Sequence, residues 1–108
     1  MTPEELLELY RHALDLTQRM LVAARSSDWD GLVKLEVERD RLIENARHHD
    51  VEAPRSPALR QQKRELLQQI ITQDEEIRTL TQDWMRELRD ILSSVNNAQR
   101  LSKTYTQN

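Results

Sequence analysis

The architecture of this chain depends on residues 59–101, which read LRQQKRELLQQIITQDEEIRTLTQDWMRELRDILSSVNNAQRL. At about 100° per residue, apolar positions of this stretch fall within a narrow arc and form one stripe along a single helix. The stripe consists of Leu59, Leu66, Ile70, Ile77, Leu80, Trp84, Leu88, Ile91, Val95 and Ala98. A second seam, about a quarter-turn away, consists of Leu67, Met85 and Leu92. Two seams on one helix indicate neighbours on more than one side, which is typical of a helical bundle.

Two shorter helices are predicted before this stretch. Thr2, with a proline beside it and Glu5 three residues later, is typical of a capped helix start. Apolar spacings of four and three then predict a helix near residues 3–25. Ser27 is the expected N-cap of a second helix near residues 28–48. So short a connection predicts that these two helices are antiparallel.

The long helix is expected near residues 57–93, because Ser56 and Pro57 form a cap and first-residue pair. The segment SSVNN lowers helix propensity, which allows a short fourth helix after Ser94. The apolar stripe is about twice as long as either upstream helix, so one end of it needs another surface for burial. We predict an all-α fold in which residues 1–108 form a single domain. This domain is an antiparallel three- to four-helix bundle with one long C-terminal helix.

The composition restricts both the fold and the compartment. The 108 residues include one Gly, three Pro, no Phe and no Cys, which favours helix throughout and excludes disulfides and thiolate metal sites. No apolar run approaches the length of a membrane span, and the acidic start of the chain is unlike a signal peptide. The formal charge of −3 does not suggest nucleic-acid binding, which requires a clustered positive surface. We therefore expect a cytoplasmic protein without membrane or direct nucleic-acid partners.

The chain lacks the residue patterns of several enzyme classes. Nucleophile elbows, Walker loops and dinucleotide fingerprints need several glycines, and this sequence has only Gly31. His48 and His49 are adjacent and diverge on a helix, while His12 stands alone, so no metal site is expected. We predict no catalytic residue, no cofactor and no metal.

The second predicted helix carries charge on its apolar face. Glu36 and Arg39 lie near the middle of an arc that otherwise holds Trp29, Leu32, Leu35, Ile43 and Ala46. These two residues either pair with each other or extend past the core, or they make a polar contact with a partner, and both interpretations stay open. Gly31 lies in the first turn, where a close approach to the first helix explains it.

One enzyme family shares part of the long-helix pattern. The first long helix of the all-helical chorismate mutases is similar at Arg64, Ile70, Asp74, Ile77, Leu80 and Arg86. Those enzymes need two further helices after that one to close the active site, and only about twenty residues follow Arg86 here. The order of elements therefore argues against this reading.

Nearly the whole chain resembles the FliT-type flagellar export chaperones. The resemblance is carried by the second helix, the long helix and the closing run, at Trp29, Leu32, Glu36, Val37, Arg39, Ile43, Ile70, Asp74, Ile77, Leu80, Ala98, Leu101 and Tyr105. It implies a small helical chaperone that binds the filament-cap protein in the cytoplasm, prevents its premature assembly and delivers it to the flagellar type III export apparatus. Members also contact the export ATPase complex, and some bind the flagellar master transcription regulator. Long members continue past the tyrosine into a helix that covers the client groove. Here we expect that helix to be absent, or reduced to the segment after Ser94.

The long stripe supplies the candidate client site. We hypothesise that an amphipathic client helix docks along Ile77, Leu80, Trp84, Leu88 and Ile91, with Trp84 as the anchor. Tyr105, from the closing run of the resemblance, is included among the partner-binding residues. In the alternative, the first helix or a folded-back C-terminus covers the same residues. A further alternative function is a purely structural bundle that self-associates through its overhanging stripes. The structural bundle would form a tight dimer, whereas the chaperone is expected to be a monomer or a weak homodimer.

Overall fold

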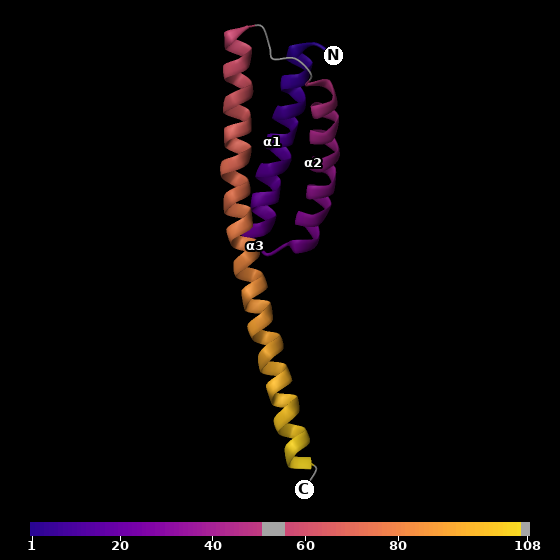
Figure 1. Cartoon of the computed structure of the whole chain (residues 1–108), viewed down its shortest axis with the longest axis vertical. Helices are drawn as coiled ribbons and strands as arrows, with labels where there is room; N and C mark the ends of the chain where they lie inside the picture. Colours follow the sequence, from indigo (N-terminus) through magenta and orange to yellow (C-terminus); the bar gives the residue numbers. More distant parts are fainter. Residues whose placement is uncertain (51–55, 107–108) are drawn as a thin grey trace. The chain divides into compact units, whose positions relative to one another are not determined.

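The structure, a computed structural model, describes residues 1–50 and 56–106, with side chains described as far as residue 100. Over these residues the secondary structure is entirely helical: α1 spans Pro3–Arg25, α2 spans Trp29–His49 and α3 spans Pro57–Thr106 (Figure 1). This confirms the predicted all-α fold with a long C-terminal helix. The chain divides into two compact units, Met1–Arg78 and Thr79–Asn108, which are described separately below.

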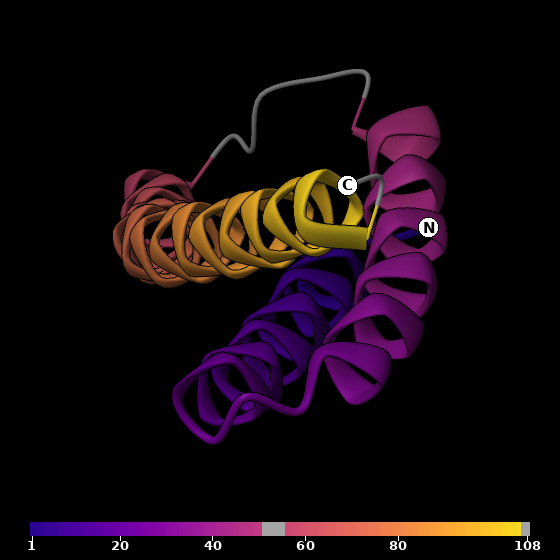
Figure 2. The same cartoon turned by 90° about the horizontal axis from the view of Figure 1, so that it is seen from below.

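The first unit is an antiparallel bundle made of α1, α2 and the beginning of α3. The three helices lie side by side, and each runs opposite to the one before it in the chain (Figure 1). Figure 2 shows the short connection between α1 and α2 at the near end. The antiparallel order of α1 and α2 is as predicted, because a connection of three residues between Arg25 and Trp29 leaves no room for another direction.

The core of this unit is built mainly from α1, which is buried on more than one side. Its buried apolar residues are Leu6, Leu7, Tyr10, Ala13, Leu16, Met20, Leu21, Ala23 and Ala24. The other helices contribute Leu32 and Ala46 from α2, with Ile70 and Ile77 from α3. Removing these side chains from water is the main term that stabilises the bundle. At one end, Leu6, Tyr10 and Ala46 form a cluster against which Leu66 and Leu67 of α3 pack.

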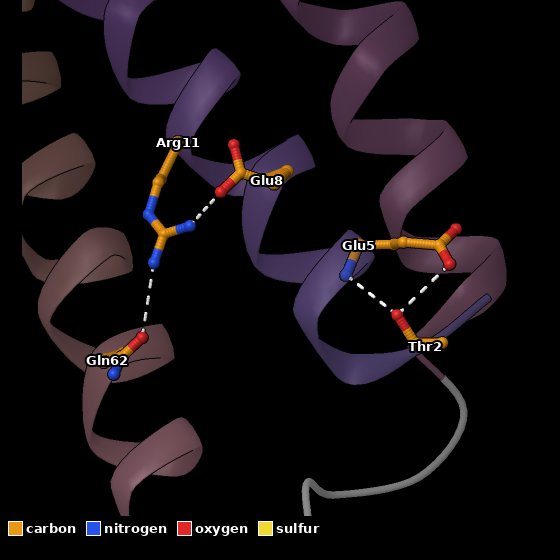
Figure 3. Close-up of polar contacts among 5 residues, drawn as sticks. All are labelled: Thr2, Glu5, Glu8, Arg11 and Gln62. Atoms are coloured by element: carbon orange, nitrogen blue, oxygen red, sulfur yellow. Dashed lines mark hydrogen bonds and ion pairs between the residues drawn. The ribbon is translucent and has the colours of Figure 1, made fainter.

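Two caps define the start of α1 and the turn that follows it. The Glu5 amide donates to the Thr2 hydroxyl over 3.1 Å, as predicted for an N-cap (Figure 3). At the other end Ser27 has a φ of 58°, the left-handed conformation of the residue after a helix. Its amide donates to the Ala24 carbonyl and the next amide donates to the Ala23 carbonyl, the two bonds of a Schellman motif. Ser27 therefore closes α1, and the prediction that it caps α2 is wrong.

The N-cap of α2 is Asp28, whose carboxylate accepts from the Gly31 amide over 3.0 Å. A Cβ built on Gly31 would lie 2.3 Å from the Asp28 Oδ2 atom. The glycine therefore makes room for the cap of its own helix, and the predicted close approach to α1 is wrong. The capping bond satisfies one of the amides that a helix start leaves without a partner.

The helix α3 continues to Thr106, past the predicted end near residue 93. The short separate helix expected after Ser94 is therefore wrong, since residues 94–106 belong to α3. Serine and asparagine cost only a few tenths of a kcal/mol each in a helix, and neither a glycine nor a proline interrupts this segment. A low-propensity stretch without a breaker was not enough to end the helix.

Candidate functional site

The predicted client-site residues differ in exposure along α3. Ile77 is 7% exposed and belongs to the core of the first unit. In the second unit Leu80, Trp84 and Leu88 are partly buried, and Ile91 is 59% exposed. Tyr105 lies within α3, and its side chain is outside the described side chains. The helix therefore places Leu80, Trp84, Leu88 and Ile91 along one face, and from Leu80 onward none of them is fully buried.

The second apolar seam is also open to solvent in this unit. Met85 is 41% exposed and Leu92 is 54% exposed, and on the first stripe Val95 is 47% exposed. We call the set Leu80, Trp84, Leu88, Ile91 and Val95 the apolar stripe. Together with the second seam it makes an apolar surface on two neighbouring sides of one helix. Such a continuous surface is typical of a binding face rather than of scattered surface residues.

Charged side chains lie along one side of the apolar stripe. At about 100° per residue, Asp83, Glu87 and Asp90 lie along one flank of the stripe, the second apolar seam forms the other flank, and Arg86 and Arg89 lie on the far side of the helix. All five are exposed, and Asp83 and Arg86 approach each other only to 3.8 Å. The stripe therefore has an acidic edge on one side and an apolar edge on the other, which would favour a partner helix with basic residues along one side of its apolar face.

The C-terminal segment does not cover this surface by folding back. Residues 94–106 continue the same helix, and a helix cannot lay its own later turns over its earlier ones. One of the two ways in which the stripe was expected to be covered from within the chain is therefore excluded for the described residues. The other way, coverage by α1, is tested by the effect of Trp84→Ala and Leu88→Ala on stability, as described in the Discussion.

A buried ion pair joins the three helices of the first unit. Arg39 of α2 is 9% exposed, and one of its terminal nitrogens lies 2.5 Å from the Asp74 carboxylate of α3. The same nitrogen donates to the Thr17 hydroxyl of α1 over 3.1 Å, and that hydroxyl donates to the Ala13 carbonyl over 2.8 Å. Glu36 is exposed, so the interpretation in which Glu36 and Arg39 pair on a buried face is wrong. An unpaired buried guanidinium is costly, so the helices must pack in an arrangement that keeps Arg39 beside Asp74 and Thr17.

A second polar cluster lies where α2 ends. The Tyr10 hydroxyl donates to the Asp50 carboxylate over 2.8 Å, and the Lys63 ammonium lies 2.5 Å from the same carboxylate oxygen. Burial, and then the hydrogen bond to Asp50, raise the pKa of Tyr10 to about 12. Burial also acts to raise the pKa of Asp50, but hydrogen bonds from Lys63 and Tyr10 outweigh it and hold that pKa below its usual 3.8. One residue of α1, one of α3 and the residue closing α2 are thus tied together.

Polar contacts on the bundle surface link α1 to α3. Arg11 contacts Glu8 on its own helix and donates to the Gln62 side chain of α3 over 3.3 Å (Figure 3). Arg25, in the last turn of α1, lies 2.7 Å from Glu76 of α3. These residues are exposed, so each pair contributes at most about 1 kcal/mol and serves mainly to align the helices.

An open groove lies between α1 and α2 on the first unit. It has a volume of about 400 Å³, and its apolar lining consists of Leu16, Val37 and Leu42. Its polar lining consists of His12, Lys34, Glu38, Arg41 and Asn45. Sequence reasoning missed this groove. The available signal was a pair of valines, Val33 and Val37, one turn apart on the otherwise polar side of α2.

The described residues offer no further chemistry of the kinds considered from the sequence. Among them, no group of three His, Cys, Asp or Glu side chains comes together as a metal site would require. In that same part of the chain, no helix combines the length and apolar character needed to cross a membrane.

Comparison with known proteins decides the family. The family model described as "Flagellar protein FliT" matches residues 7–108. The chain belongs to the FliT family. A FliT protein of Photorhabdus laumondii is 30% identical over 103 residues, covering 95% of this chain and 82% of the relative. A FliT protein of Yersinia pseudotuberculosis is 30% identical over 104 residues, covering 96% of this chain and 87% of the relative.

A solved FliT structure shares the fold. The crystal structure of flagellar protein FliT from Bordetella bronchiseptica has a TM-score of 0.70 and 32% sequence identity, covering 80% of this chain and 98% of that one. The resemblance to the FliT family is therefore confirmed. The matched names describe a flagellar protein and no reaction, so nothing in them supports the mutase alternative.

Proposed function

We propose that this flagellar protein is an export chaperone that binds the filament-cap protein in the cytoplasm, prevents its premature assembly and delivers it to the type III export apparatus. Membership of the FliT family supports the assignment to flagellum assembly. The protein acts by binding and not by catalysis. Its further partners are the export ATPase complex and the flagellar master transcription regulator, and the whole chain works as one export-chaperone domain.

The observation that carries the proposal is the exposure of the apolar stripe. Ile91 and Val95 are 59% and 47% exposed, and they continue the row begun by Leu80, Trp84 and Leu88. Contiguous apolar surface in water is unfavourable and marks a surface that another molecule buries. The natural complement to a single amphipathic helix is another amphipathic helix, packed with its apolar positions against the stripe.

Trp84 is the proposed anchor of the client site. Aromatic residues dominate the energy of such contacts because they bury a large area with few rotatable bonds. It sits near the middle of the stripe, with Leu80 and Leu88 one turn away on either side. Ile77, which the sequence placed in the site, is buried in the first unit and contributes to the fold instead.

The proposal is tested by mixing the purified chain with purified filament-cap protein and measuring complex formation by size-exclusion chromatography and calorimetry. We expect a defined complex that contains the cap protein in soluble, unassembled form. A light-scattering series on the chain alone separates the chaperone from the structural bundle. A tight dimer at every concentration that does not take up the cap protein would contradict the proposal.

A further inference from the structure

Exposed apolar side chains lie on α2 at and beside its groove with α1. Val37, which lines the groove, is 49% exposed, and Val33, one turn earlier, is 58% exposed. Neither valine is among the buried residues of α2, so the core of the first unit does not use them. With Leu16 and Leu42 in the lining, Val37 gives the groove an apolar surface that gains free energy when another molecule removes it from water.

The unpaired cations of α2 gather at this groove. The helix has four Lys and Arg side chains, of which Arg39 and Arg47 form ion pairs with acids of the same chain. The other two, Lys34 and Arg41, are exposed, and both line the groove. Neither takes part in an ion pair among the described residues. Of the five Asp and Glu side chains of α2, only Glu38 lines the groove. An otherwise acidic helix therefore presents a basic surface here, which suits an acidic partner.

The spacing of the two cations suits one edge of a second helix. Lys34 and Arg41 are seven residues apart, which puts them on one face of α2 about 10 Å apart along its axis. A helix lying along the groove matches them with two carboxylates that are also seven residues apart. Glu38 lies between the two cations, one turn from each, and repels a carboxylate at the middle of that helix. The groove therefore selects an apolar helix face whose edge is acidic at two positions and not acidic between them.

We propose that the groove between α1 and α2 is a second docking surface, which binds a helical segment of a partner protein by its apolar face and by two carboxylates seven residues apart. The carboxylates contact Lys34 and Arg41, and the apolar side chains beside them pack against Leu16, Val37 and Leu42. The electrostatic part of this contact weakens with added salt.

This surface is separate from the proposed client site. None of its lining residues belongs to the apolar stripe. The acidic edge of the stripe, at Asp83, Glu87 and Asp90, repels a partner that itself has an acidic edge. The two surfaces therefore select helices of opposite charge, and one chain binds a client and a second protein at the same time. The second partner binds whether or not the stripe holds a client.

A synthetic helical peptide of about 20 residues serves as the probe, long enough to form several turns. The acidic peptide has a row of leucines bordered by two glutamates seven residues apart, and the lysine peptide has lysines in their place. Titration into the isotope-labelled full chain, followed by the NMR shifts of backbone amides, locates the bound peptide. The acidic peptide should shift amides around His12 and along residues 34–45, and the lysine peptide should leave them unchanged. A third glutamate midway between the two should weaken binding, and Glu38→Gln should restore it.

Charge reversal tests the two cations directly. Lys34→Glu/Arg41→Glu should weaken binding of the acidic peptide by about tenfold or more, and this groove variant should bind the lysine peptide instead. The control Arg60→Glu/Arg64→Glu reverses two exposed arginines of α3 in the first unit and should bind the acidic peptide as the wild type does. Circular dichroism of each variant checks that its helices are retained.

Several outcomes would overturn the proposal. A wild-type chain that does not bind the acidic peptide is one, and shifts confined to residues 80–95 are another, because they would place the peptide on the stripe. A groove variant that still binds the acidic peptide as tightly as the wild type would also overturn it. Saturation with purified filament-cap protein should leave the affinity for the acidic peptide unchanged. Loss of peptide binding in that complex would make the groove part of the client site and refute a second surface.

Discussion

Asp74→Ala is expected to destabilise the first unit more than Arg39→Met does, although both changes break the same ion pair. The two partners differ in their access to water. The Arg39 side chain is 11% exposed and that of Asp74 is 36% exposed. Removing the carboxylate leaves a buried cation whose remaining acceptor is the Thr17 hydroxyl, and its Nε atom already has no hydrogen-bond partner. Removing the arginine leaves a carboxylate that water can reach.

The magnitudes follow from this asymmetry. Removing one partner of a fully buried pair costs about 3–5 kcal/mol, and water access to Asp74 reduces this to about 2–3 kcal/mol for Asp74→Ala. For Arg39→Met we expect about 1 kcal/mol, since methionine fills most of the volume and the carboxylate stays hydrated. The double variant should be more stable than Asp74→Ala alone, because it removes the unpaired buried cation.

Chemical denaturation followed by circular dichroism at the helix band measures these differences in the free energy of unfolding. Helix content at zero denaturant serves as the control that each variant still folds. Equal losses for the two single variants would contradict the reasoning. A larger loss for Arg39→Met, or a double variant no more stable than Asp74→Ala, would contradict it as well.

Three further predictions concern polar contacts of the first unit. Gly31→Ala should lack the stabilisation of about 0.5–1 kcal/mol that this change usually brings in a helix, because the new Cβ displaces the Asp28 cap. In an Asp28→Ala background, which has no such cap to displace, Gly31→Ala should stabilise the protein in the same denaturation assay. The Tyr10 pKa is raised to about 12 in the folded protein, so the stability that Tyr10 contributes below pH 10 should be lost as the pH rises from 10 towards about 12. Tyr10→Phe should therefore reduce the fall in stability over that range. The Asp50 pKa is lowered in the folded protein, so the contribution of Asp50 to stability is present above pH 3.8 and should be lost below it. Lys63→Met should reduce this loss of stability in acid. Denaturation midpoints whose pH dependence does not respond to the Tyr10 and Lys63 substitutions would refute these two expectations.

Local signals in the sequence predicted the helices well wherever one chemical feature dominated. Thr2 and its proline gave the start of α1, and the long apolar periodicity gave α3. The errors arose where two local features competed for one residue. Ser27 could cap α2 or close α1, and the Schellman bonds decided in favour of closing α1. At Ser94 a weak propensity was opposed by helical residues on both sides, and the helix continued.

Long-range pairing could not be predicted from the sequence in the same way. Arg39 was recognised as a charge on an apolar face, but its partner Asp74 lies 35 residues away. Which acid it meets depends on the rotation and register of α3, and no local pattern specifies these. The core position of Tyr10 follows from spacing, whereas its bond to Asp50 depends on where α2 ends. The apolar stripe of the candidate site can be predicted from the sequence. That Ile77 is buried while Ile91 is exposed is known only from the packing of the helices.

The most direct test of the client site compares Trp84→Ala and Leu88→Ala with the control Ile71→Ala. Ile71 is 52% exposed on the opposite side of α3 and leaves the stripe intact. Calorimetric titration with purified filament-cap protein should show binding weakened by about 2 kcal/mol or more for each stripe variant and unchanged for the control. Denaturation should show little change in stability for any of the three. A loss of stability of about 3 kcal/mol or more in the stripe variants would identify Trp84 and Leu88 as core residues covered within the chain, and unchanged binding of the cap protein would contradict the proposed site.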